Sequence, residues 1–274
     1  MSKIIIAKKA GFCYGVKRAI DLAQSVPGKA FSLGQLIHNP QMISRLKKEG
    51  IDCVDSIDQV PDSATVIIRA HGETDAVFSK AKAKNLKVVN ATCPFVNKVH
   101  VLAKTMEQDG YQVVVLGEAD HPEIIGIIGN LRAGMVINDL AQAKKLPQFK
   151  KIGLVSQTTQ QHKTFNNIKK ELSSHCQELK AIDTICDATS SRQHAARELA
   201  QHVDYLIVIG GKNSGNTNRL FQICNELTES IHIETVEELD FDLIKKKTTV
   251  GITAGASTPD FLIQQVVDQI SKLD

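Results

Sequence analysis

Residues 88–94 read Val88-Val89-Asn90-Ala91-Thr92-Cys93-Pro94, an apolar run that predicts a buried strand and ends in a cysteine. Pro94 fits the first position of a following helix, where its missing N–H costs no hydrogen bond. Two further runs have this form, residues 4–7 before Cys13 and residues 181–185 before Cys186. The dipole of a helix favours an anion at its start, so the pattern predicts three thiols prepared as ligands.

The pattern continues beyond each cysteine. In each third of the chain a second apolar run ends in a glycine, and a polar residue follows a few positions later. A third and a fourth run come next, and the fourth again ends near a polar residue. The polar positions are His38 and His71, His121 and Thr158, and Ser214 and Ser257. We interpret this self-similarity as a threefold internal repeat of roughly 80 to 95 residues.

The repeat predicts an α/β protein of three similar lobes. We expect the first lobe at residues 14–93, the second at 94–186 and the third at 187–274, with the third completed by a strand within residues 1–13. Parallel α/β sheets bind ligands beyond the carboxyl ends of their strands. The cysteines and polar residues of the three lobes are therefore expected to meet in one cavity, in a pseudo-threefold arrangement around a shared centre.

A cysteine near a strand end is often only a small buried hydrophobe. Three cysteines in register with polar partners favour a ligand set over that interpretation. Three other cysteines lack this register and are expected to be packing residues: Cys53 in a short strand, Cys176 near the end of a helix, and Cys224. The sequence has no C-x-x-C pair, which argues against a zinc ribbon or a thioredoxin-type site.

The composition is that of an ordinary globular protein. Of 274 residues, 42% are hydrophobic and 23% are charged. No run approaches the about 18 apolar residues of a membrane span, so no membrane partner is expected. No signal-like segment is found and the cysteines suit a reducing compartment, which predicts a cytoplasmic protein. A net charge of +3 with 4% aromatic residues favours solvated lysines over a nucleic-acid surface.

Three thiolates suit two kinds of metal site. Zinc with three cysteines usually takes a histidine as its fourth ligand, whereas a cubic iron–sulfur cluster normally takes one cysteine per iron. In the second case, three cysteines leave one iron without a protein thiolate. An open metal position can bind a substrate oxygen, which is a catalytic feature that electron transfer alone does not need.

Short hydrogen-bonding side chains near the strand ends indicate an anionic ligand such as a diphosphate. They are His38, His71, His121, Thr158, Ser214, Asn216 and Ser257. The glycine-rich segment 210–216 resembles a phosphate-binding loop but lacks the P-loop spacing, and a plain turn explains it about as well. Glu123 adds a carboxylate to this set and is a candidate proton donor, although it is also a common kind of residue at a helix start.

Ordered motifs run along nearly the whole chain. They are Gly11-Phe12-Cys13, Ile37-His38-Asn39, Ala70-His71-Gly72, Ala91-Thr92-Cys93-Pro94 with Lys98-Val99-His100, His121-Pro122-Glu123, Gln157-Thr158-Thr159, Asp183-Thr184-Ile185-Cys186 with Arg192-Gln193, Asn213-Ser214 with Asn216, and Thr253-Ala254-Gly255-Ala256-Ser257. This set resembles the LytB family, the hydroxymethylbutenyl diphosphate reductases. Gly215 stands where some members have a second serine, so this position offers a backbone N–H.

The resemblance implies three α/β lobes around one [4Fe-4S] cluster per chain, held by Cys13, Cys93 and Cys186, with one iron open to the substrate hydroxyl. The implied reaction is the two-electron reductive dehydroxylation of (E)-4-hydroxy-3-methylbut-2-enyl diphosphate to isopentenyl and dimethylallyl diphosphate, the last step of the non-mevalonate isoprenoid pathway. A ferredoxin or flavodoxin would supply the electrons.

The resemblance also implies a role for each polar candidate. The diphosphate would be bound by His38, His71, Ser214, Gly215, Asn216 and Ser257. Glu123 would deliver protons with the help of His121 and Thr158, which would also contact the substrate. The alternative functions are a structural zinc protein or another iron–sulfur protein of the dehydratase type.

Overall fold

The computed structural model describes residues 3–273, which form three parallel four-stranded sheets. The first sheet has the order β3 (Ile51–Val54), β2 (Ala30–Leu33), β4 (Thr65–Ile68), β5 (Lys87–Asn90). The second has the order β7 (Met135–Ile137), β6 (Gln112–Leu116), β8 (Phe149–Ser156), β9 (Cys176–Ala181). The third has the order β11 (Ser230–Ile233), β10 (Tyr205–Ile209), β12 (Thr249–Ala254), β1 (Lys3–Ile6). The three sheets share one strand order, which confirms the predicted three-lobed α/β fold.

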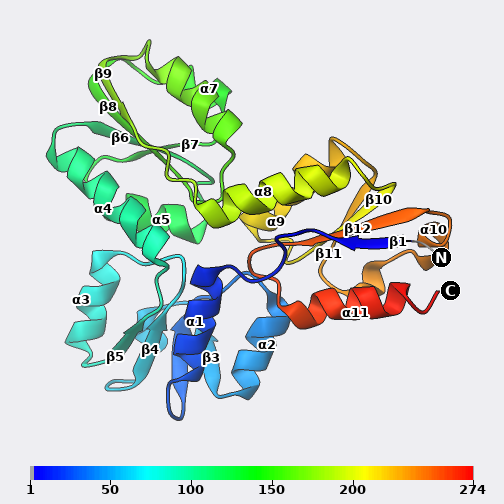
Figure 1. The fold of residues 1–274 in the computed structure, drawn as a ribbon. Helices are drawn as coiled ribbons and strands as arrows, with labels where there is room; N and C mark the ends of the chain where they lie inside the picture. The colour runs from blue at the N-terminus through cyan, green and yellow to red at the C-terminus, as the bar shows by residue number, and fades with distance from the viewer. Residues whose placement is uncertain (1–2, 274) are drawn as a thin grey trace. The chain divides into compact units, whose positions relative to one another are not determined.

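Helices connect the strands, as parallel pairing requires. They are α1 (Tyr14–Gln24), α2 (Pro40–Lys48), α3 (Asp75–Ala83), α4 (Pro94–Gln108), α5 (Pro122–Ile128), α6 (Leu140–Ala143), α7 (His162–Leu172), α8 (Asp187–Ala200), α9 (Gly215–Asn225), α10 (Phe241–Ile244) and α11 (Asp260–Ile270), with short 3-10 turns η1 (Ile57–Gln59) and η2 (Val236–Glu238). Figure 1 shows the helices along the faces of the sheets. Among the described residues, no helix has the length and apolar character needed to cross a lipid bilayer.

Alternation along the central strands produces a core on both faces of a sheet. On β6, Val113 and Val115 pack with α4 and α5, whereas Val114 and Leu116 pack with α6 and α7. Successive side chains of a strand point to opposite faces, so a continuous apolar run is what a sheet covered on both faces requires. The third sheet is built in the same way, with α8 and α9 on one face and α10 and α11 on the other.

The described chain divides into two compact units. The terminal unit comprises residues 3–17, 37–44 and 187–273 and contains the third sheet. The central unit comprises residues 18–36 and 45–186 and contains the first two sheets. Within the terminal unit, β1 pairs in parallel with β12, so the N-terminal strand lies in the third sheet. The lobe boundaries at residues 93/94 and 186/187 stay a prediction.

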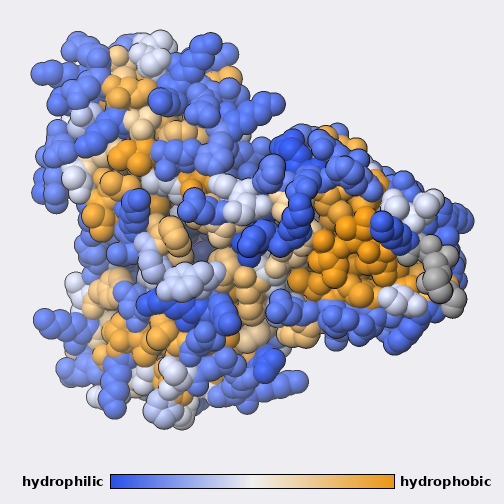
Figure 2. All heavy atoms as spheres, in the orientation of Figure 1, coloured by the Kyte–Doolittle hydropathy of each residue, from blue (hydrophilic) through white to orange (hydrophobic). Residues whose placement is uncertain are grey.

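The strands that precede the cysteines are edge strands, not the buried strands that their apolar character predicts. Each of β1, β5 and β9 pairs on one side only, and each is largely half-exposed or exposed. Figure 2 shows hydrophobic surface over β1 and α11. Hydrophobicity cannot distinguish an edge strand from a central one, because that difference depends on which strands pair.

One of the three cysteines outside the predicted ligand set differs from expectation. Cys53 is exposed on the edge strand β3, so its assignment as a packing residue is wrong. Cys176 is the first residue of β9, soon after α7 ends, and packs against the core of the second sheet, as predicted. Cys224 is fully buried against the third sheet, as predicted, and burial raises the pKa of its thiol to about 12.

Candidate active site

Each predicted ligand cysteine is tied through its backbone to the end of the neighbouring strand of its own sheet. The N–H groups donate from Cys93 to the carbonyl of Ala70 at 2.9 Å, from Cys186 to that of Thr158 at 3.1 Å, and from Cys13 to that of Ala256 at 3.0 Å. In each repeat the acceptor is the predicted polar residue at the strand end or the residue just before it. One repeated hydrogen bond therefore holds each cysteine beside a polar candidate.

The three cysteines are partly exposed and lie next to helix starts. Cys93 is the N-cap of α4, where Pro94 occupies the first turn as predicted. Cys186 directly precedes α8, and Cys13 directly precedes α1 and accepts a hydrogen bond at Sγ from the N–H of Val16 at 3.5 Å. Helix starts stabilise a thiolate, the form in which cysteine binds metal.

Glu123 and Thr158 form a buried pair in the central unit. The carboxylate of Glu123 accepts the Thr158 N–H at Oε1 over 2.7 Å and the Thr158 hydroxyl at Oε2 over 2.8 Å. Glu123 is 2% exposed and Thr158 is 6% exposed. Two hydrogen bonds from one residue fix the plane of the carboxylate, because each oxygen has its own donor.

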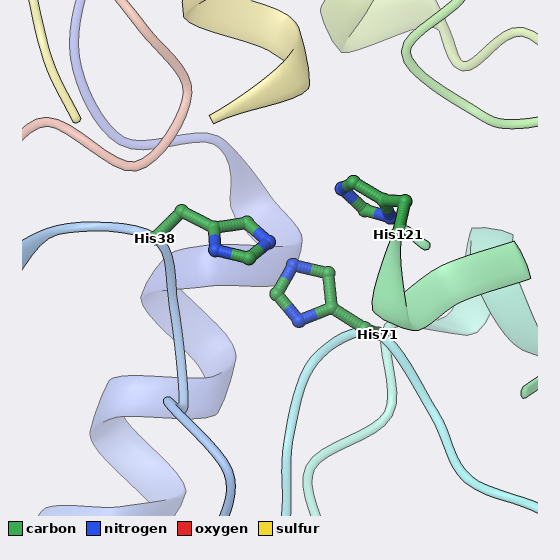
Figure 3. Close-up of side chains that lie close together, drawn as sticks. All are labelled: His38, His71 and His121. Atoms are coloured by element: carbon green, nitrogen blue, oxygen red, sulfur yellow. The ribbon is translucent and has the colours of Figure 1, made fainter. Parts of the chain in front are cut away.

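His121 begins the helix that carries Glu123. It is the N-cap of α5, and its Nδ1 accepts the N–H of Glu123 at 3.1 Å. Nδ1 therefore carries no proton, so the proton of the neutral ring is on Nε2. The ring of His71 meets that of His121 edge to face, with centroids 5.4 Å apart and planes at 85° (Figure 3). His38, the third ring drawn there, belongs to the terminal unit.

In the terminal unit, the backbone of His38 lies against the end of β12 and the loop after β10. The hydroxyl of Ser257 donates to the carbonyl of His38 at 3.0 Å. A Cβ on Gly211 would come within 2.7 Å of the same oxygen. Gly211 therefore permits a close approach of two loops that any side chain there would prevent.

The start of α9 provides the remaining polar candidates. Ser214 is the N-cap, and its hydroxyl accepts the N–H of Thr217 at 3.4 Å. Gly215 is the first helical residue and Asn216 the second, and Asn216 is only 4% exposed. Neither Nδ2 nor Oδ1 of Asn216 has a hydrogen-bond partner among the described residues. Buried amides are normally bonded, so this one indicates a site that a polar ligand completes.

Several residues that hold the site together were not predicted. Arg192 is buried on α8, and its Nε and one terminal nitrogen donate to the carbonyl of Gly11, two residues before Cys13. Gln157 is fully buried and accepts the N–H of Glu118 at 3.1 Å. Both residues occur in the motifs that carry the family resemblance, but the sequence alone does not show which groups their side chains hydrogen-bond.

Comparison with known proteins agrees with the fold and with these motifs. A family model described as LytB protein matches residues 4–271. The chain belongs to the LytB family. A relative from Geobacter sulfurreducens, called 4-hydroxy-3-methylbut-2-enyl diphosphate reductase, is 45% identical over 277 residues, which cover 99% of this chain and 98% of that protein. The protein of the same name from Aquifex aeolicus is 44% identical over 100% of this chain and 97% of its own length.

Two solved structures share the LytB fold. One, described as (E)-4-hydroxy-3-methyl-but-2-enyl diphosphate reductase, the terminal enzyme of the non-mevalonate pathway, is 44% identical with a TM-score of 0.73 and covers 99% of this chain and 100% of its own. The other, a reductase from Plasmodium falciparum, is 28% identical with a TM-score of 0.92 and covers 98% of this chain and 88% of its own. The predicted family resemblance is confirmed over the full chain.

Proposed function

We propose that this chain reduces (E)-4-hydroxy-3-methylbut-2-enyl diphosphate to isopentenyl and dimethylallyl diphosphate. The C–O bond of the allylic alcohol breaks, the oxygen leaves as water after taking one proton, and two electrons enter the carbon skeleton. A second proton then quenches the allyl anion, at either end for the two products. The observation that carries the proposal is the hydrogen bond that holds each cysteine beside a strand-end polar residue in all three repeats.

The donor set fits an iron–sulfur centre, and within that class we propose one [4Fe-4S] cluster held by Cys13, Cys93 and Cys186. All three are partly exposed and lie next to helix starts, whereas Cys224 is buried near the end of α9. With three cysteine ligands the cluster would supply electrons and one iron open to the substrate hydroxyl. Each of these cysteines is fixed by its backbone, so its position does not depend on the metal alone.

For the diphosphate we propose the contacts that the family resemblance implies. In the terminal unit, Ser214 is the N-cap of α9 and is followed by Gly215 and Asn216, at a position where the helix dipole favours an anion. The partnerless amide of Asn216 supports this assignment. The remaining proposed contacts are His38, Ser257, His71, His121 and Thr158.

For proton delivery we propose a relay from Glu123 through Thr158. The Thr158 hydroxyl donates to Glu123 Oε2, so the same hydroxyl can pass its proton to the substrate and take another from a protonated Glu123. Since His121 accepts at Nδ1, its donor is Nε2–H, and we propose that this group contacts the substrate. All three residues are buried, which keeps the proton transfer away from bulk water.

As electron donor we propose a ferredoxin or a flavodoxin, and as compartment the cytoplasm. Exposed aromatic rings follow two of the ligand cysteines closely: Tyr14 is 65% exposed and Phe95 is 44% exposed. Such rings offer contact area for a small redox protein beside the proposed ligands. Cysteines that form no disulfide bond suit a reducing compartment.

The test is anaerobic iron and sulfide analysis, with turnover on the diphosphate substrate, for the wild type and Cys93→Ser. We expect about four irons and four sulfides per wild-type chain, broad absorbance near 400 nm, and loss of cluster and turnover in the variant. Cys53→Ser is the matched control, because Cys53 is exposed and outside the ligand set.

Each other outcome has a defined meaning. Full cluster content and turnover in Cys93→Ser would refute the ligand assignment. A colourless protein that contains zinc and unfolds with a chelator would favour the structural zinc alternative. A cluster protein without turnover on this substrate would favour another iron–sulfur activity.

A further inference from the structure

The ring of His100 lies between the backbones of two glycines in the central unit. His100 is on α4 and is 8% exposed. A Cβ on Gly72, in the loop after β4, would come 3.1 Å from its Nε2, and a Cβ on Gly126, in α5, would come 3.2 Å from its Cε1. Gly72 also has a φ of +78°, which side chains rarely adopt. The ring thus fills the space between a loop of the first sheet and a helix of the second.

Asn130, just after α5, fixes the hydrogen bonding of this ring. Its Oδ1 accepts the N–H of Asp75 at 2.7 Å, so its Nδ2 is the donor end. Nδ2 lies 3.0 Å from the carbonyl of Gly126 and 3.1 Å from Nδ1 of His100. An amide NH₂ only donates, so His100 accepts at Nδ1 and carries its proton on Nε2.

The surroundings keep His100 neutral. Burial and, after it, the positive charge of Lys104 lower the pKa of His100 to about 4, while Asp75 acts in the opposite direction. Near neutral pH the ring therefore stays an acceptor for Asn130.

The same loop is held at two more points. The ammonium of Lys104, on α4, lies 2.5 Å from the carboxylate of Asp75. A Cβ on Gly129 would come within 2.5 Å of Cγ2 of Thr74, so the end of α5 packs directly on the loop. Residues 72–75 are thus fixed against α4 and α5 by packing, by the Asn130 amide and by an ion pair.

We propose that His100 and Asn130 are a positioning pair that sets His71 against His121 and Glu123. His71 directly precedes Gly72, whereas His121 and Glu123 occupy the start of α5. The two histidine rings already meet at 5.4 Å, and their spacing depends on how the loop is held on α5. Because His71 is a diphosphate contact only in the proposed function, the role of the pair rests on that function. Neither residue is among the proposed diphosphate contacts or the proposed cluster ligands.

Two variants of the holoenzyme test the proposal. Asn130→Asp keeps the size and the acceptor for Asp75 N–H but removes the donor to His100, and His100→Leu removes the acceptor. We expect KM to rise about tenfold in both, with kcat within about twofold, because the hydrogen bonds between Glu123 on α5 and Thr158 after β8 involve no residue of the segment 72–75. His100→Asn keeps an acceptor near the position of Nδ1 and should restore most of the KM. Asn138→Asp adds the same charge at an exposed site and is the control.

Readouts other than turnover separate positioning from folding. Calorimetry with inorganic pyrophosphate should show weaker binding to both variants, and hydrogen exchange of the Asp75 amide should be faster, while iron per chain stays at the wild-type value. Wild-type KM and pyrophosphate affinity in variants with faster Asp75 exchange would overturn the positioning role. A fall in iron content and Tm with unchanged KM would reduce the pair to a structural one. If the wild type neither turns over nor binds pyrophosphate, the proposed function itself fails, and the positioning role is overturned with it.

Discussion

The starts of α5 and α9 occupy the same place in two repeats but are completed in different ways. α5 follows β6 and α9 follows β10, which have the same position in their sheets, and both helices have a polar N-cap, His121 in one and Ser214 in the other. The second helical residue is Glu123 in α5 and Asn216 in α9, and both side chains are buried. Glu123 has a donor on each carboxylate oxygen, whereas neither amide atom of Asn216 has a partner.

In the proposed function, this difference separates a group that transfers a proton from a group that binds the diphosphate. A proton donor has to be held in place before the substrate arrives, so its hydrogen bonds come from the protein. A binding group gains its hydrogen bonds from the ligand, so it lacks them beforehand and carries an energetic cost until the ligand binds. In the proposed function, the same helix start would therefore serve proton transfer in one repeat and substrate binding in another, because one side chain differs.

The largest effect is expected at Glu123. In Glu123→Gln the carboxylate is lost and the shape is kept, so turnover should fall about 100-fold or more with the iron content unchanged. Single-turnover assays on the reduced enzyme measure this directly. Glu226→Gln, at the exposed C-cap of α9, is the control. Turnover equal to that of the wild type would remove Glu123 from the mechanism.

Thr158 should show the next largest effect. Thr158→Val removes the hydroxyl that donates to Glu123 Oε2 and is expected to lower kcat about 30-fold, since a hydrogen bond to a charged group contributes roughly 1.5–3 kcal/mol. Thr158→Ser keeps the hydroxyl and should recover most of the rate. Equal rates for the valine and serine variants would mean that the hydroxyl does not relay protons.

Asn216 tests the binding side of the comparison. Asn216→Ala should raise KM about tenfold and change kcat little, because its hydrogen bonds form only with the diphosphate. The Tm of the ligand-free variant should be unchanged or slightly higher, since a buried partnerless amide is removed. Asn225→Ala, at the exposed far end of the same helix, is the control. A fall in Tm by more than about 4 °C would show that the amide is already bonded in the free protein.

Ser257 should show the smallest effect. Ser257→Ala removes the hydroxyl that donates to the carbonyl of His38, a neutral hydrogen bond that contributes roughly 1 kcal/mol. We expect KM to rise about threefold and Tm to fall by about 2–4 °C. A thermal melt and a substrate titration measure both changes. A KM that rises as much as in Asn216→Ala would indicate a direct and stronger contact with the substrate.

The sequence predicted the repeat and the strand ends well. The third apolar runs of the first two repeats form the short strands β3 and β7, because each run has clear ends. The run before Cys186 was read as a strand, yet β9 stops at Ala181 and a loop leads to the cysteine. Apolar residues in that loop, such as Ile185, are buried without belonging to a sheet, and periodicity cannot tell the two cases apart.

The sequence predicted which residues are candidates for the site but not which hydrogen bonds connect them. The repeated strand-end positions placed Thr158 among the candidates, and Glu123 was added as a carboxylate close to one of them. The hydrogen bonds between the two residues could be found only from the coordinates. His100 and Asn130 lie thirty positions apart on separate elements, and no period connects them. Contacts of this kind arise from how helices pack on neighbouring sheets, which a local pattern does not record.

The shared bond from each cysteine to the next strand has a consequence for how such a protein can change. In the proposed function, a thiolate ligand and a substrate contact follow adjacent strands of each sheet, and one backbone hydrogen bond connects the two segments. When that sheet moves, both segments move with it, so the distance between the proposed metal ligand and the proposed substrate contact of one repeat stays the same. Exchange of a whole lobe between related proteins would then transfer the proposed metal ligand and the proposed substrate contact together.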